Sequence, residues 1–376
     1  MAPDSFKGSL TSVQVATALG DGWGRGRPAD EVHLAPLADG GEGTLDALLA
    51  SGGWMPLPVA ARDPLDRPIG TRILSRNHEA VVELAEASGL SRLAPQERDA
   101  MTASTFGTGL MLAAAVGLGA RRVVLGLGGS ATTDGGSGLL RALGARFLDA
   151  SGGELPPGGG PLRLLDRIDL SGLTPVLGEV HLTIASDVTN PLLGLLGAAV
   201  TYGPQKGAAP ADVRRLDDSL ERCADVLERA TGRRFRDVPG SGAAGGAAFG
   251  LLAIADRFAS FEIRPGVEVA MELTGFSDAL EHADLVLSGE GRIDAQTAFG
   301  KTCLGVARRA ADAAKSCICF GGGVTPEGAA ALLVLGALAI PVAEGPATLE
   351  ASVAAGTGPL ERAAERVARL VSLAAE

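Results

Sequence analysis

The chain has 376 residues, more than one ordinary hydrophobic core of about 100 to 200 residues accommodates, so we expect two domains. Hydrophobic residues make up 46% of the sequence, which excludes global disorder. The net charge of −11 and the aromatic content of only 3% argue against a nucleic-acid-binding protein, whose binding face is usually basic or rich in stacking side chains. A negative average still permits a small anionic substrate, because one focused pocket can override it.

Cysteine content and hydropathy indicate where the protein works. Four cysteines in a chain of this length predict no disulfide framework, so we expect a reducing, cytoplasmic environment. The start, MAPDSFKGSLTS, has neither the basic nor the apolar region of a signal peptide. The longest uncharged stretch, 101–120, is interrupted by Thr, Ser and Gly, so no membrane span is expected. The oligomeric state stays open, with a homodimer as one option.

Strand-like segments alternate with glycine-rich loops and helices, which predicts an α/β fold with largely parallel sheets. The expected strands cover 32–37, 71–75, 80–84, 122–127, 179–186, 284–288, 316–320 and 337–343. Helical periodicity is clearest over 211–231, behind Pro210, and in a closing helix that includes Leu360 and Val371. APDSFKG reads as the loop after a first strand, although only Met1 and Ala2 precede that loop.

Four of the expected strands are followed by loops that carry carboxylates, and three of these loops are rich in glycine. The loops are DGGEGT (39–44), GGSATTDGG (128–136), DVTNP (187–191) and GEGRID (289–294). In open α/β sheets ligands bind beyond the carboxyl ends of the strands. Glycines let backbone N–H groups approach an anion, and carboxylates beside a phosphate need a divalent cation such as Mg²⁺. The loops therefore predict metal-assisted phosphoryl transfer. The alternative is that these glycine- and aspartate-containing sequences only form turns and bind no ligand.

Other motifs are weaker. AQTAFGKT (295–302) lacks the first glycine of a phosphate-binding loop, because Ala295 stands there. GLGGSA (126–131) fits a dinucleotide-binding pattern, but Asp134 would place a negative charge near the pyrophosphate. Cys317 and Cys319 are expected to be core residues. The sequence contains no G-x-S-x-G motif of a serine hydrolase.

A set of long, ordered motifs resembles the bacterial glycerate kinase family, type I, from Ala2 to Gly323. The motifs are APDSFKGSLTS (2–12), PLADGGEGT (36–44), GLGGSATTDGGSG (126–138), ASDVTNPLLG (185–194), YGPQKGA (202–208), PGSGAAGG (239–246) and SGEGRIDAQTAFGKT (288–302). The chain departs from the family's usual pattern at its start, where apolar residues before APDSFKG are missing. It also departs at Tyr202, where Phe is common.

The resemblance implies ATP-dependent phosphorylation of D-glycerate to 2-phosphoglycerate and ADP, with Mg²⁺, in glyoxylate or sugar-acid catabolism. It also implies two α/β domains. One is a discontinuous, Rossmann-like three-layer domain of residues 1–66 plus 275–376, and the other is an α/β domain of residues 67–274 inserted into it.

On this resemblance, site residues can be assigned as hypotheses. The candidate catalytic residues are Lys7, Asp39, Asp187, Glu290 and Asp294, with Asp39 and Asp187 also as candidate Mg²⁺ ligands. The candidate substrate-binding residues are Ser5, Ser9, Lys206 and Arg292, whose guanidinium could bind a carboxylate through two hydrogen bonds. The candidate ATP-binding residues are Gly128, Gly129, Ser130, Thr133, Gly135, Gly136 and Lys301.

Two other functions stay open at this stage. A nicotinamide-dependent hydroxy-acid oxidoreductase would change the absorbance of its cofactor on mixing with hydroxy acids. A non-catalytic nucleotide or sugar-acid sensor would be stabilised by its ligand without releasing ADP.

Overall fold

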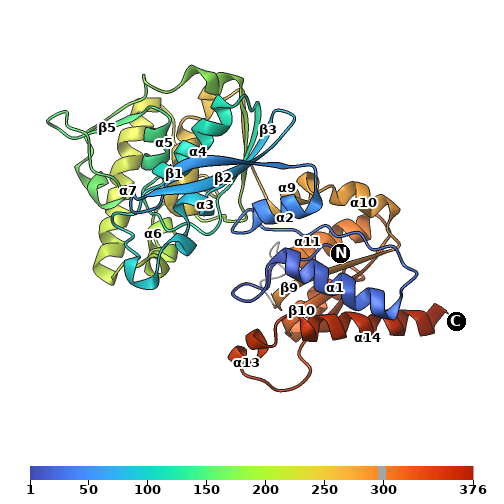
Figure 1. Ribbon diagram of the computed structural model, residues 1–376. Coiled ribbons are helices and arrows are strands. Elements are labelled where there is room, and N and C mark those ends of the chain that lie inside the picture. Colours follow the sequence, from blue (N-terminus) through green and yellow to red (C-terminus); the bar gives the residue numbers. More distant parts are fainter. Residues whose placement is uncertain (295–301, 376) are drawn as a thin grey trace. The chain divides into compact units, whose positions relative to one another are not determined.

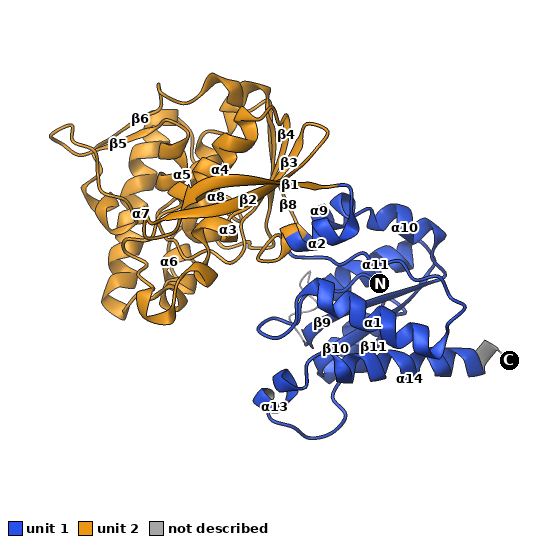
Figure 2. Cartoon of the chain, in the orientation of Figure 1, with its two compact units in different colours: residues 1–39, 46–53, 267–376 blue, residues 40–45, 54–266 orange. Residues whose placement is uncertain are grey.

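The computed structural model describes residues 1–294 and 302–375, and the chain forms two compact units (Figures 1 and 2). Unit 1 contains residues 1–39, 46–53 and 267–376, and unit 2 contains residues 40–45 and 54–266. The domain boundaries predicted from the sequence, after residues 66 and 274, differ from the boundaries of these two units, which include those after residues 53 and 266. Strand β1 (Met55–Arg62) belongs to unit 2 because it pairs with β2 (Pro68–Arg76) along its whole length. Val267 and Ala270 belong to unit 1 because their side chains enter its core.

Unit 1 has three layers, with helices on both faces of a parallel sheet. Its sheet has the order β11-β10-β9, with β9 at Leu285–Ile293, β10 at Ser316–Val324 and β11 at Leu338–Pro341. Its helices are α1 (Ser12–Gly26), α2 (Thr44–Ser51, which begins in unit 2), α9 (Gly266–Leu273), α10 (Phe276–His282), α11 (Thr302–Asp312), α12 (Pro326–Leu333), α13 (Leu349–Ala354) and α14 (Gly358–Ala375).

Two N-terminal segments extend this sheet beyond β9. Asp4 N donates to Gly289 O at 2.8 Å, so residues 1–4 lie parallel to β9. Leu37 N donates to Pro3 O at 2.8 Å, which places residues 33–37 beside them. Residues 32–37 lie beside this segment but are not assigned as a β-strand, so the strand predicted there is wrong. Met1 and the first residues of APDSFKG nevertheless lie beside β9, where a first strand would lie.

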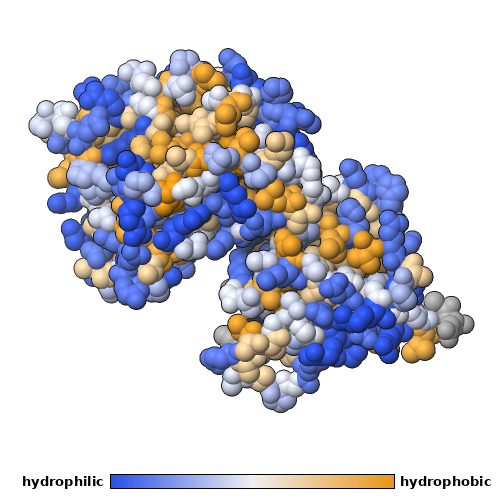
Figure 3. Space-filling model, viewed as in Figure 1, coloured by the Kyte–Doolittle hydropathy of each residue, from blue (hydrophilic) through white to orange (hydrophobic). Residues whose placement is uncertain are grey.

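Alternation along the strands divides the core of unit 1 between the two faces of the sheet. In β10, Cys317 and Cys319 pack with α9 to α12, whereas Ile318 and Phe320 pack with α1 and α14. Helices α1 and α14 lie side by side, as Figure 1 shows, and a Cβ on Gly22 would lie 2.1 Å from a backbone oxygen of α14. Charged side chains cover the outer surface of α14, which is hydrophilic in Figure 3.

Unit 2 contains a six-stranded mixed sheet with the order β1-β2-β3-β4-β7-β8. The pairs from β3 to β8 are parallel, and β1, β2 and β3 form an antiparallel meander. The remaining strands are β3 (Glu79–Glu83), β4 (Arg122–Gly126), β7 (His181–Ala185), β8 (Ser260–Arg264) and the separate pair β5 (Arg146–Leu148) and β6 (Arg167–Asp169). Both units are therefore α/β, which confirms the predicted fold class.

The helices of unit 2 pack around one continuous hydrophobic core. They are α3 (Ala85–Ser88), α4 (Phe106–Gly117), α5 (Ser137–Ala142), α6 (Ala198–Tyr202), α7 (Pro210–Thr231) and α8 (Ala243–Ala253). Short 3₁₀ helices lie at 90–92, 95–97, 160–164, 175–179, 204–206 and 255–257. The helix predicted over 211–231 is confirmed as α7, whose Leu216, Leu220 and Leu227 are fully buried.

Candidate functional site

In unit 1, charged side chains gather where the parallel segments end. Lys7 follows the first extended segment and Asp39 follows the second, and Lys7 Nζ lies 2.8 Å from Asp39 Oδ2. The Lys7 side chain is 76% exposed and that of Asp39 is 34% exposed, so this ion pair faces solvent. The structure thus brings together two residues that the sequence singled out from loops 32 positions apart.

Asp4 lies beside this pair and was missed by the sequence analysis. Its side chain is only 8% exposed. Its carboxylate accepts hydrogen bonds from Ser5 N at 2.6 Å and from Thr302 Oγ1 at 2.7 Å. Burial raises the pKa of Asp4 and the negative charge of Asp39 raises it further, while the hydrogen bonds and Lys7 act in the opposite direction. The signal for this residue was its place at the end of the first extended segment, like the other carboxylates.

The predicted serines of the first loop have mainly local roles. Ser5 contributes its backbone N–H to Asp4, and Ser9 Oγ donates to Phe6 O at 2.8 Å. Gly8, with φ of +79°, allows the tight turn that exposes the neighbouring Lys7 side chain. The loop therefore presents Lys7 to solvent.

The end of β9 carries the other predicted charges of unit 1. Glu290 is 5% exposed and its charge contributes, after burial, to raising the pKa of Cys303. Arg292 Nε lies 3.0 Å from Asp294 Oδ2, so one flanking carboxylate binds the guanidinium expected to bind substrate. The Arg292 side chain remains 70% exposed. Lys301 lies outside the described residues.

In unit 2, the loop after β4 is packed closely against residues 40–41. A Cβ on Gly128 would lie 2.3 Å from Gly41 Cα, and Gly128 N donates to Gly40 O at 3.2 Å. Gly129 follows with φ of +70° and is exposed. Buried Glu83 fixes the other side of the 40–45 loop by accepting the N–H groups of its last residues. The part of the loop open to an anion is therefore centred on Gly129.

The second half of the same loop is buried, which changes the interpretation of its predicted phosphate contacts. Gly135 N donates to Gly245 O at 3.0 Å, and Gly136 N donates to Asp134 Oδ1 at 3.1 Å. These N–H groups hold the loop to α8 and to Asp134, so the contacts give both glycines a structural role. Thr133 is also fully buried, and its Oγ1 has no hydrogen-bond partner among the described residues.

Lys206 reaches this loop from the 3₁₀ helix 204–206. Its side chain is 2% exposed, and Nζ donates to Ser130 Oγ at 2.8 Å and to Thr132 O at 2.6 Å. Burial lowers the pKa of Lys206 to about 7, with the charge of Asp134 opposing that effect. Lys206 and Ser130, predicted from separate motifs, are thus in direct contact.

Asp187 follows β7 and is exposed. Its Oδ1 accepts a hydrogen bond of 2.8 Å from Gly266 N, the first residue of α9. A carboxylate at this position also stabilises a helix N-terminus. Asp187 therefore has a structural contact in addition to its predicted catalytic or metal-binding role. It belongs to unit 2, whereas Asp39 belongs to unit 1.

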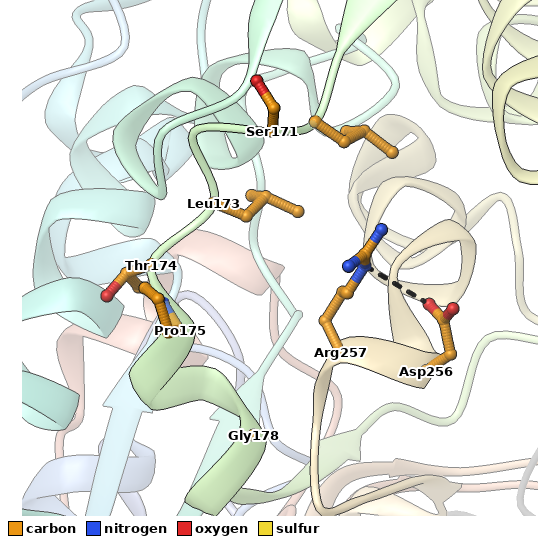
Figure 4. A pocket seen from close by; sticks show the side chains of 8 residues that line it. Ser171, Leu173, Thr174, Pro175, Gly178, Asp256 and Arg257 are labelled. Atoms are coloured by element: carbon orange, nitrogen blue, oxygen red, sulfur yellow. Dashed lines mark ion pairs between the residues drawn. The ribbon is translucent and has the colours of Figure 1, made fainter.

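A separate pocket of about 610 Å³ lies in unit 2 (Figure 4), and the residues that line it are Leu170, Ser171, Leu173, Thr174, Pro175, Gly178, Asp256 and Arg257. Its residues precede β7 and β8, so it opens at the amino ends of these strands. Asp187 and the glycine-rich loop follow the carboxyl ends of β7 and β4. Because ligands of α/β sheets bind at the carboxyl ends, we do not assign the chemistry to this pocket.

Comparison with known proteins identifies the family. Residues 1–372 match the model of the glycerate kinase family. The chain belongs to the glycerate kinase family. A glycerate kinase from Halalkalibacterium halodurans is 43% identical over 312 residues, which is 82% of this chain and 81% of that protein. A glycerate 2-kinase from Escherichia coli is 39% identical over 329 residues, 87% and 85% of the two chains.

A solved structure gives the same result for the fold. It is described as that of a glycerate kinase 2 from Salmonella typhimurium LT2 and is 37% identical in sequence. The two structures match with a TM-score of 0.84 over 100% of this chain and 98% of the other. Family membership makes this chain a kinase, with ATP as its co-substrate. Within residues 1–294 and 302–375, no helix is long and apolar enough to cross a bilayer.

Proposed function

We propose that this kinase transfers the γ-phosphoryl group of ATP to the 2-hydroxyl group of D-glycerate, giving 2-phosphoglycerate and ADP in organic-acid catabolism. The observation that carries the proposal is the similarity to glycerate kinases along nearly the whole chain, including a protein named glycerate 2-kinase. The Lys7–Asp39 pair supports it, because phosphoryl transfer to a small anion needs a cation and a carboxylate close together.

The residues of unit 1 would act on glycerate and on the reacting oxygen. Exposed Lys7 would neutralise the carboxylate of glycerate or the phosphoryl group, and the exposed guanidinium of Arg292 would bind the carboxylate while Asp294 orients it. Ser5 and Ser9 lie in the same short loop as Lys7 and would add hydroxyl contacts. Asp39 and Glu290 are the carboxylates of this unit that would accept the proton of the hydroxyl group.

The residues of unit 2 would act on the phosphates of ATP. The exposed part of the loop after β4 is Gly129, which partly buried Gly128 precedes and buried Ser130 follows, and backbone N–H groups of this turn would approach an anion. Thr133, Gly135 and Gly136 would support this part from within rather than contact the phosphates. Asp187 is the carboxylate of this unit that would accept a proton or bind a cation.

The carboxylates of this chain could hold Mg²⁺ only together with the phosphate oxygens of ATP. Within the described residues, His, Cys, Asp and Glu side chains form no group of three or more arranged to hold a metal ion. Mg²⁺, however, needs only one or two carboxylates together with phosphate oxygens, and it would neutralise charge there. Asp39 and Asp187 are our proposed ligands, and the repulsion between Asp39 and Asp4 would favour a cation at Asp39.

An assay that couples ADP release to an optical signal tests the function. We expect ADP release with D-glycerate and ATP, and little release with L-glycerate, glycerol or hydroxypyruvate. Substrate-dependent change of a nicotinamide cofactor without ADP release would instead indicate an oxidoreductase. A ligand-induced increase in melting temperature without either product would indicate a sensor. Either result would overturn the proposal.

We further propose that the reaction takes place in the cytoplasm. The four cysteines are free, buried thiols, which supports a reducing compartment. A homodimer stays an option for the assembly, and sedimentation equilibrium of the purified protein would give the oligomeric state.

A further inference from the structure

Lys206 occupies an unusual environment for a lysine. Its side chain is 2% exposed, although lysines are almost never fully buried unless they are paired. Both hydrogen-bond partners of its ammonium group are neutral oxygens, Ser130 Oγ and Thr132 O. Burying a charged ammonium group without a carboxylate partner costs desolvation free energy. Stability of the fold therefore does not explain why Lys206 is buried.

The backbone around Lys206 keeps the side chain directed inward. Gly207 has φ of +93°, and a Cβ there would lie 2.2 Å from Arg98 O. Arg98 Nη1 in turn donates to Gln205 O at 3.4 Å. Because Arg98 packs against this turn with both its backbone and its side chain, Lys206 has little freedom to swing out toward solvent.

The atoms that Lys206 holds lie next to the accessible part of the loop after β4. Ser130 and Thr132 are buried, whereas the neighbouring Gly129 is exposed in a left-handed conformation. The ammonium group therefore lies behind the turn centred on Gly129. Backbone N–H groups in such a turn form an anion-binding concavity, and a positive charge close behind them strengthens it.

We propose that Lys206 is a positioning residue for ATP, which fixes the loop of residues 128–132 through Ser130 and Thr132 and places a positive charge behind it without touching the nucleotide. This inference rests on the proposed function, and it replaces the direct substrate contact that the sequence suggested for Lys206. It predicts a selective effect on ATP, because glycerate would bind to other residues.

The protonation of Lys206 gives a second, independent consequence. Its pKa is lowered to about 7 by burial, with Asp134 as the opposing charge and Arg98 as the cation on the adjoining turn. A bound phosphate favours the charged ammonium form. Near and above neutral pH, nucleotide binding is therefore expected to take up protons.

Steady-state kinetics of Lys206→Met, beside Lys315→Met as a matched control, tests the first consequence. Lys315 lies outside both sets of candidate residues, and the contact of its Nζ among the described residues is with a backbone oxygen, Glu281 O at 3.5 Å. We expect Lys206→Met to raise KM for ATP about tenfold or more, since it removes hydrogen bonds from a charged group. KM for D-glycerate should change less than about twofold, and the control should match wild type. Equal changes in both KM values, or none, would overturn the inference.

Calorimetry of ATP binding to the wild-type protein tests the second consequence even if the variant fails to fold. Titrations at pH 7.5 in buffers of different ionisation enthalpy give the protons taken up, after subtraction of the nucleotide's own ionisation. We expect net uptake, absent from Lys206→Met where that variant folds. No uptake by wild type would contradict the inference. If the wild-type protein releases no ADP from ATP in the presence of D-glycerate, the proposed function itself is wrong.

Discussion

Asp4 Oδ2 accepts a hydrogen bond of 2.7 Å from Thr302 Oγ1, which joins the end of the first extended segment to the first residue of α11. The two side chains are 8% and 1% exposed. A carboxylate at this position stabilises the N-terminus of α11. The same carboxylate lies beside Asp39, so a structural contact and the candidate chemistry meet at one residue.

Replacing Asp4 should change how stability depends on pH. Because burial raises the pKa of Asp4 above its ordinary 3.8, the folded state binds more protons than the unfolded state as the pH rises above that value. The free energy of unfolding of wild type therefore contains a contribution that falls with rising pH, and Asp4→Asn lacks it. Urea unfolding at pH 4 and pH 7 should show the variant gaining stability relative to wild type. The exposed Asp284→Asn should show no such gain. If the free energies of unfolding of Asp4→Asn and wild type differ by the same amount at pH 4 and pH 7, the pKa of Asp4 is not raised in the folded state.

Lys7→Met should lower activity far more than stability. The Lys7–Asp39 pair is exposed, and such pairs contribute only about 0 to 1 kcal/mol to folding. Removing a cation that stabilises the transition state typically lowers kcat by about 100- to 1,000-fold. Turnover measurements with a thermal melt of the same sample test both effects. Wild-type kcat in a folded Lys7→Met protein would remove Lys7 from the site.

Asp187→Asn separates a catalytic role from a structural one. Asn caps a helix about as well as Asp, so the contact with Gly266 N should survive and the melting temperature should stay close to that of wild type. Loss of the negative charge should lower kcat by about 100-fold or more if Asp187 acts as a base or binds Mg²⁺. If the variant keeps wild-type turnover, Asp187 is only the cap of α9.

Gly129→Ala should affect ATP more than the fold. Gly129 and Gly119 both have positive φ, +70° and +94°, so Ala at either position costs about 1 to 2 kcal/mol of backbone strain. Gly119→Ala is the matched control, because a Cβ there meets no atom within 4 Å. We expect similar melting temperatures for the two variants but a several-fold higher KM for ATP in Gly129→Ala alone. Equal KM values for ATP would show that the loop does not approach the nucleotide.

The sequence predicted the central elements of the fold more successfully than its edges. Strands β4, β9 and β10 contain short continuous apolar runs, and β7 contains apolar Leu182, Ile184 and Ala185, which identify these strands without tertiary information. Strand β1 was missed because it contains Pro56 and Pro58. Each proline lacks a backbone N–H donor, which weakens the sequence pattern of a strand. The sheet tolerates them because β1 lies at its edge. Strand β8 is the opposite edge and is only partly buried, so its alternation is weak as well.

The candidate site was predictable as a set of loops but not as a set of contacts. The family motifs indicated Lys7 and Asp39 separately, and only the parallel arrangement of their segments brings Lys7 Nζ within 2.8 Å of Asp39 Oδ2. Glycine content alone does not distinguish Gly129, which is exposed, from Gly135 and Gly136, whose N–H groups are used in packing. For Gly135 that distinction depends on α8, more than a hundred residues later in the sequence, and for Gly136 it depends on the Asp134 side chain.

The most direct test of the central claim is the position of the phosphate in the product. After incubation of the protein with ATP, Mg²⁺ and D-glycerate, two-dimensional ¹H–³¹P NMR should show the product phosphorus coupled to the single proton on carbon 2, together with stoichiometric ADP. Coupling to the two protons on carbon 3 would contradict the 2-hydroxyl assignment. No phosphorylated product from active, folded protein would contradict the account as a whole.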